Sequence, residues 1–359
     1  MIVGRWGRRL TGHSLVLVVV ALPALAAGAS LAAEVAPGEW ERLEWASLAP
    51  GSDSFADMFV WSCSPPIDAP GSVATADIPR WVERARIAQV LGVLACSMTG
   101  YLTGMLANGR AFALLATLLF AALPPVAGYG HVLRPDTAVA MLTMLSLLLA
   151  QLMAMSQSPA AARLRRASAW LLAPVAASCL AVAVASMPDM GSALLFPNGL
   201  AILAAILTGQ RLYRALRRRS VAVWPARAAG SRLWPFVFFA MASTVGAALL
   251  LALEGGKGAP SGIVMNGSLL PASPRLAAPV VALAVLGAVR AAVRTGRRIG
   301  SRGRVTADAV LLAYAAATLM HRAVRGEWSD GLLVAFPFAW LLAEGAILAF
   351  LLVAARLRR

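Results

Sequence analysis

Long apolar segments separated by short polar ones make up most of this chain. A helix needs about 20 apolar residues to cross a hydrocarbon core about 30 Å thick. Apolar runs near that length lie at residues 14–33, 87–107, 111–128, 137–155, 168–187, 191–209, 234–253, 276–292, 305–320 and 332–355. We therefore predict an all-α, polytopic membrane protein of about ten transmembrane helices, in which residues 1–359 form a single integral membrane domain.

The composition agrees with this prediction. Apolar residues make up 60% of the chain and charged residues 13%, whereas about 25% of the residues of soluble domains are charged. The net charge of +16 comes from arginines and one lysine, Lys257, in short runs between the apolar segments. Because these charges do not gather on one face, nucleic acid is not expected as a partner. The three cysteines, Cys63, Cys96 and Cys179, have no metal-binding spacing, so no metal site is predicted.

The charges also predict the topology. With the N-terminus in the cytoplasm, 23 of the 32 basic residues fall on the inner side and 14 of the 16 acidic residues fall on the outer side. This distribution follows the positive-inside rule and predicts a bacterial inner-membrane protein with both termini cytoplasmic. Basic cytoplasmic loops are expected at 210–233 and 293–304. We interpret their charge as topogenic, with a site for anionic lipid or a cytoplasmic partner as the alternative. The first apolar run is interpreted as an uncleaved anchor rather than a signal peptide.

The longest polar passage, residues 34–66, contains six acidic residues. It belongs to a predicted small periplasmic first loop at 34–86, which would contain amphipathic helices. Further ionisable residues are predicted on the same outer face, and the candidates for substrate binding among them are Arg86, His131, Arg134, Asp136, His321 and Arg322. Carboxylates can accept a proton and arginines can hold a phosphate, which suits a lipid-phosphate substrate. The alternative is a solvated loop whose charges pair with one another.

Two stretches resemble a known family. The first reads PGEWERLEWASLAPGSDSFADMF and is followed by Pro65-Pro66. The second covers residues 78–152 and has an arginine at the start of the second span and Arg134-Pro135-Asp136 at the start of the fourth. This pattern is similar to the GT-C glycosyltransferases, the multi-spanning class that includes protein O-mannosyltransferases and the aminoarabinose transferase of lipid A. The similarity covers residues 35–210 and is faint beyond them.

The resemblance implies a reaction and a site. The reaction is transfer of a sugar from a polyprenyl-phosphate donor to a lipid, glycan or protein acceptor at the outer face of the inner membrane. Glu39 would be the catalytic base and Asp57 a second acidic residue, while Arg86, Arg134 and Asp136 would line the donor pocket. Some members of the class use a divalent cation, so the resemblance leaves one open here.

One departure from the family pattern concerns the base. Where the family commonly has Asp-Glu, this chain has Gly38-Glu39. The alternative function is therefore a catalytically weakened scaffold that serves as a membrane subunit and binds lipid or a partner complex. A transporter is the second alternative, although the sequence shows none of the internal repeats typical of transporters. Glu344, inside the last span, needs a partner at membrane depth, and we predict a structural hydrogen bond between helices rather than a proton relay.

Overall fold

The computed structural model describes residues 3–29, 78–127, 135–156, 163–186, 234–253, 274–302, 311–316, 318–319 and 331–357. Regular secondary structure within these ranges is helical, as predicted. The helices are α1 (Val3–Gly28), α4 (Ile78–Asn108), α5 (Arg110–Ala122), α6 (Pro124–Ala127), α7 (Pro135–Ser156), α8 (Arg163–Ser186), α12 (Trp234–Leu253), α13 (Pro274–Arg302) and α15 (Gly331–Leu357).

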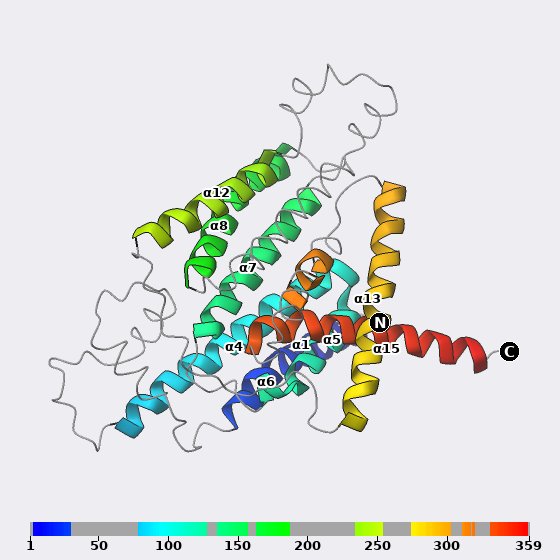
Figure 1. Ribbon diagram of the computed structural model, residues 1–359. Coiled ribbons are helices and arrows are strands. Elements are labelled where there is room, and N and C mark those ends of the chain that lie inside the picture. The colour runs from blue at the N-terminus through cyan, green and yellow to red at the C-terminus, as the bar shows by residue number, and fades with distance from the viewer. Residues whose placement is uncertain are drawn as a thin grey trace, which may run out of the picture.

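The helices pack in a sequence that runs from α12 at one side to α13 at the other (Figure 1). Helix α12 packs on α8, α8 on α7, and α7 on α4. Helices α1 and α5 pack against α4 and against each other, while α15 packs against α5 and α7. Helix α13 packs along α15. This order places α4, α7 and α15 in the interior and leaves α12 and α13 at the periphery.

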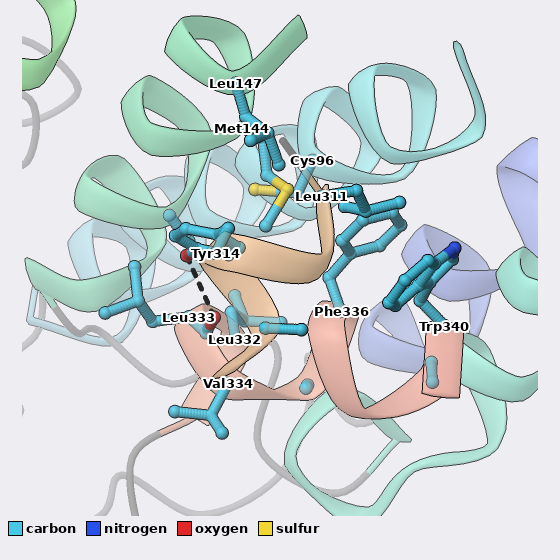
Figure 2. Close-up of a cluster of buried hydrophobic side chains, with 14 of the residues drawn as sticks. Cys96, Met144, Leu147, Leu311, Tyr314, Leu332, Leu333, Val334, Phe336 and Trp340 are labelled. Carbon is cyan, nitrogen blue, oxygen red and sulfur yellow. Dashed lines mark hydrogen bonds between the residues drawn. The ribbon is translucent and has the colours of Figure 1, made fainter. Parts of the chain in front are cut away.

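The core lies where the first half of α15 meets α4, α7 and residues 311–316 (Figure 2). The Tyr314 hydroxyl donates a hydrogen bond to the Leu333 carbonyl oxygen at 3.3 Å. Phe336 lies so close to Gly100 that a Cβ at that position would be 2.5 Å from its ring. A glycine here lets α15 approach α4, as small residues do between membrane helices. The first half of α15 is consequently buried on all sides.

The third apolar run is not one continuous helix, contrary to the predicted span at 111–128. Helix α5 ends at Ala122 because Leu123 has an extended backbone, with φ −70° and ψ 138°. Pro124 explains this, since proline disfavours the helical conformation for the residue before it. Helix α5 has 13 residues and rises only about 20 Å, which is shorter than a hydrocarbon core.

Three of the described helical segments are long and apolar enough to cross a membrane: Arg86–Asn108, Ala277–Arg297 and Leu332–Leu357. They coincide with the spans predicted at 87–107, 276–292 and 332–355, and they indicate a membrane-associated protein. Shorter apolar helices of 10–17 residues occupy parts of other predicted spans: Leu15–Gly28, Arg110–Ala122, Thr137–Leu152, Leu172–Val184 and Met241–Leu250. The span predicted at 191–209 lies outside the described residues. The number of ten spans and the side of each loop stay predictions.

The stretch predicted as a basic loop at 293–304 continues α13 as far as Arg302. Alanine and arginine both favour helix, and α13 contains no proline after Pro279. Arginines in the last turns also interact favourably with the negative end of the helix dipole. Residues 210–233 and the first loop up to residue 77 lie outside the described part of the chain.

The predicted topology can be tested with reporters. A reporter fused after Arg219 is expected to be cytoplasmic and one fused after Lys257 periplasmic, because the basic residues gather on the predicted inner side. Paired alkaline phosphatase and fluorescent protein fusions at both positions would measure this. The opposite pair of locations would overturn the assignment of every loop to its face.

Candidate functional site

Most of the predicted outer site lies outside the residues that the structure describes. The candidates in this position are Glu39, Asp57, His131, Arg134, His321 and Arg322. Arg86 and Asp136 are described, the latter as part of the α7 backbone only. Of the predicted site, the structure therefore describes only the part that lies near the starts of α4 and α7.

Arg86 lies near the start of α4 and is only 2% exposed. It shares the buried face of α4 with Gln89, Val93 and Cys96, at the helical spacing i, i+3, i+7 and i+10. Arg84, two residues earlier, is exposed. Burial of a guanidinium is costly unless other groups compensate it, so Arg86 is not a solvated surface charge.

The same face of α4 contacts the first turn of α7. The Cys96 thiol lies 3.9 Å from the Thr137 carbonyl oxygen. A Cβ at Gly92 would be 2.6 Å from the Thr137 methyl group, so glycine permits this close approach. Arg86 lies six residues before Gly92, or about 9 Å along the helix. The fold thus brings Arg86 to the end of the bundle at which α7 begins, and Asp136 belongs to that first turn.

A second polar group lies at the other end of α4 and was not predicted as a site. We call Asn108, Arg290, Arg294 and Glu344 the Glu344 cluster. Glu344 is fully buried, and its carboxylate oxygens accept hydrogen bonds from Arg290 Nη1 at 2.9 Å and Arg294 Nη2 at 2.5 Å. Asn108 Nδ2 donates a third, at 2.6 Å to Oε1. Arg290 Nη1 also lies 3.2 Å from the Glu344 carbonyl oxygen.

Two glycines explain how α13 and α15 come close enough for these contacts. A Cβ on Gly287 would fall on the carbonyl group of Leu341, and one on Gly345 would fall on that of Leu283. The backbones therefore touch at this crossing, which is visible in Figure 1 where α15 passes α13. Arg290 follows Gly287 by three residues and Glu344 directly precedes Gly345, so the crossing sets their separation.

Asn108 reaches the cluster because α4 ends there. Gly109 has φ +90°, in the region that favours glycine, and α5 starts at the next residue. The chain therefore turns sharply at the level of Glu344. The predicted interhelical hydrogen bond of Glu344 is confirmed, and it extends to two ion pairs and three helices.

The basic residues of this region were interpreted as topogenic charge, so the pairing of Arg290 and Arg294 with Glu344 was not predicted. A signal was present: Arg290 and Arg294 are four residues apart and share a helix face, and Glu344 is an acidic residue well inside an apolar run. The spacing alone could not show that α13 and α15 cross at this point.

No group of three or more metal-ligating side chains occurs in the described part of the chain. Comparison with protein-family models, with curated proteins and with solved structures finds no match for this chain.

Proposed function

We propose that this protein transfers a sugar from a polyprenyl-phosphate donor to a lipid, glycan or protein acceptor at the outer face of a bacterial inner membrane. In this proposal the donor phosphate binds at the end of the bundle where α4 and α7 begin. Arg86, Arg134 and Asp136 line the donor pocket, His131, His321 and Arg322 contribute to substrate binding, and Glu39 is the base, with Asp57 beside it. The reaction class rests on the resemblance of residues 35–210 to GT-C glycosyltransferases.

The observation that supports this proposal is the burial of Arg86 on the face of α4 that, further along the helix, packs on the first turn of α7. The resemblance selects Arg86 and Asp136 as parts of one pocket, and the packing of Gly92 and Cys96 on Thr137 holds their helices together at that end. Electrostatic attraction between a guanidinium and a phosphate is stronger in such a place than in water, because the local dielectric constant is lower. The long apolar helices supply a membrane location for the lipid tail.

Donor binding is expected to depend on Arg86. Arg86→Gln should weaken binding of polyprenyl phosphate by about 1.5–3 kcal/mol, the usual contribution of a hydrogen bond to a charged group. Arg84→Gln is the matched control, because Arg84 is exposed on the same turn of α4 and should bind like the wild type. Titration of the purified protein with polyprenyl phosphate measures both. Equal affinities in the two variants would assign Arg86 to the structure of the α4–α7 contact instead.

Turnover separates the enzyme from the non-catalytic alternative. With a polyprenyl-phosphate-linked sugar, Glu39→Gln should abolish transfer and preserve donor binding, since only the proton acceptor is lost. If Glu39 points away from the pocket, Gly38→Asp should instead raise activity. The departure at Gly38 favours the second candidate, a membrane subunit that binds lipid without catalysis. A wild type that binds the donor but is inert with every donor–acceptor pair would establish that candidate.

A further inference from the structure

We propose that Tyr314 and Pro337 form a hinge lock in α15, one of the interior helices of the bundle. The Tyr314 hydroxyl takes the place of the backbone hydrogen bond that the proline removes, and so fixes the first turn of α15 in position. When this bond opens, residues 331–334 move as a unit about Pro337. The inference concerns α15 and its neighbours and does not depend on the proposed sugar transfer.

The proline lies where the helix needs a hydrogen-bond donor. Pro337 is the seventh residue of α15. In an α-helix each carbonyl oxygen accepts a hydrogen bond from the amide four residues later, and proline has no amide hydrogen. The Leu333 carbonyl therefore has no donor in the regular pattern of the helix. Leu333 also has no exposed surface, so water does not replace the missing bond.

Few backbone hydrogen bonds attach the first turn to the rest of α15. Only two residues of the helix, Gly331 and Leu332, precede Leu333, so the regular pattern supplies two bonds before the gap. The ring of a proline inside a helix also crowds the carbonyl of the residue four positions earlier and kinks the helix there. The backbone of α15 is consequently weakest between its first turn and Pro337, and this is the hinge.

Tyr314 supplies the missing donor from outside the helix. Its hydroxyl donates a hydrogen bond to the Leu333 carbonyl oxygen at 3.3 Å, drawn as the dashed line in Figure 2. Tyr314 is itself buried, and Thr318 steadies its turn by donating a hydrogen bond to the Tyr314 carbonyl oxygen at 2.8 Å. Prolines are tolerated in membrane helices where neighbouring groups satisfy the carbonyl that they free. Here that neighbouring group is the hydroxyl of a single tyrosine.

The pivot of the hinge is anchored by α4 and α5. The ring of Phe336, next to Pro337, lies against Gly100 of α4. It also meets the ring of Phe120 of α5 edge to face, with 6.2 Å between the centroids. The apolar packing around the first turn is non-directional, so the hydrogen bond from Tyr314 sets the direction of that turn relative to the anchored part of α15.

A proline in α1 provides a comparison. Ser97 Oγ donates a hydrogen bond at 2.7 Å to the carbonyl oxygen of Val20, which lies three residues before Pro23. The regular donor to Val20 is the amide of Ala24, which has its hydrogen, so Ser97 adds a donor rather than replacing one. A hydroxyl is therefore required at the proline of α15 and only supplementary at the proline of α1.

Hydrogen–deuterium exchange of the full chain in detergent micelles tests the proposal. Tyr314→Phe removes the hydroxyl and keeps the ring. We expect the amides of residues 335 and 336, which pair with the first turn, to exchange about tenfold faster in this variant, since one buried hydrogen bond is lost. Pro337→Ala returns an amide donor to the Leu333 carbonyl, so in that background Tyr314→Phe should change exchange less than twofold. Ser97→Ala is the matched control and should leave these two amides within twofold of the wild type.

Three results would overturn the proposal. Equal exchange in the wild type and Tyr314→Phe would mean that the tyrosine ring alone holds the first turn. A tenfold effect that persists in the Pro337→Ala background would place the action of the hydroxyl elsewhere, and the same acceleration in Ser97→Ala would show a general loss of stability. If Tyr314→Phe does not fold, the yield of monodisperse protein is compared instead. Tyr314→Phe/Pro337→Ala should then recover the wild-type yield, and a double variant as poor as Tyr314→Phe would refute the lock.

Discussion

Replacing Gly287 or Gly345 with alanine is expected to separate α13 from α15. At either position a Cβ would fall on a backbone carbonyl group of the other helix, and backbone cannot move aside as a flexible side chain can. Overpacking of a well-packed site costs about 1–3 kcal/mol and occasionally more, so we expect each variant to lose about 3 kcal/mol or more. Unfolding of the purified protein in mixed detergent micelles would measure this loss.

Gly296 supplies the control for this experiment. It lies on the same helix as Gly287, and a Cβ there would meet no atom within 4 Å among the described residues. Gly296→Ala is therefore expected to be neutral or to stabilise α13 by about 0.5–1 kcal/mol, the difference in helix propensity between the two residues. If Gly287→Ala and Gly296→Ala unfold alike, α13 and α15 do not cross where the structure places them.

Replacing Glu344 with alanine is expected to be the most damaging change of a single charged residue in the described helices. The substitution leaves Arg290 and Arg294 without the carboxylate that both contact. Removing one partner of a buried ion pair typically costs about 3–5 kcal/mol, and the two arginines left here are largely buried. The same unfolding measurement applies. Glu83→Ala, which removes an exposed glutamate at the start of α4, should change stability by no more than about 0.5 kcal/mol.

A triple variant distinguishes loss of the ion pairs from loss of side-chain volume. Arg290→Met/Arg294→Met/Glu344→Leu replaces the charges with apolar groups of similar size, and such replacements are often neutral or stabilising. We expect it to recover most of the stability that Glu344→Ala loses. A triple variant as unstable as Glu344→Ala would mean that packing of the glutamate side chain, and not its charge, holds the three helices together.

The helical class and the positions of several membrane segments could be predicted because they depend on local properties of the chain. An apolar run near 20 residues has few alternatives to a helix in a membrane, since every backbone polar group must be satisfied internally. The predicted segments at 87–107, 276–292 and 332–355 accordingly coincide with long helices. The break at Leu123 also has a local cause, Pro124. The prediction was based on hydropathy, in which a single proline counts for little, so residues 111–128 were predicted as one helix.

The outer site was predicted by a different kind of reasoning, and the structure describes only two of its residues, Arg86 and the backbone of Asp136. The choice of Arg86 came from the resemblance to a family; the structure shows that its side chain is buried on α4, and its role in a site stays a prediction. Beyond Gln89 nearly every position of α4 is apolar or small, so the sequence does not show which face of this part of the helix meets α7. The contact of Gly92 and Cys96 with Thr137 decides this.

The sequence by itself determined that this chain forms apolar helices and that Glu344 needs a partner. Only the tertiary structure decided that Arg290, Arg294 and Asn108 are among its partners. The physical reason is that hydropathy and charge patterns describe each helix alone, whereas pairing depends on where two helices cross. Here the crossing depends on Gly287 and Gly345, whose missing side chains let the backbones touch and bring residues more than 50 positions apart to one point.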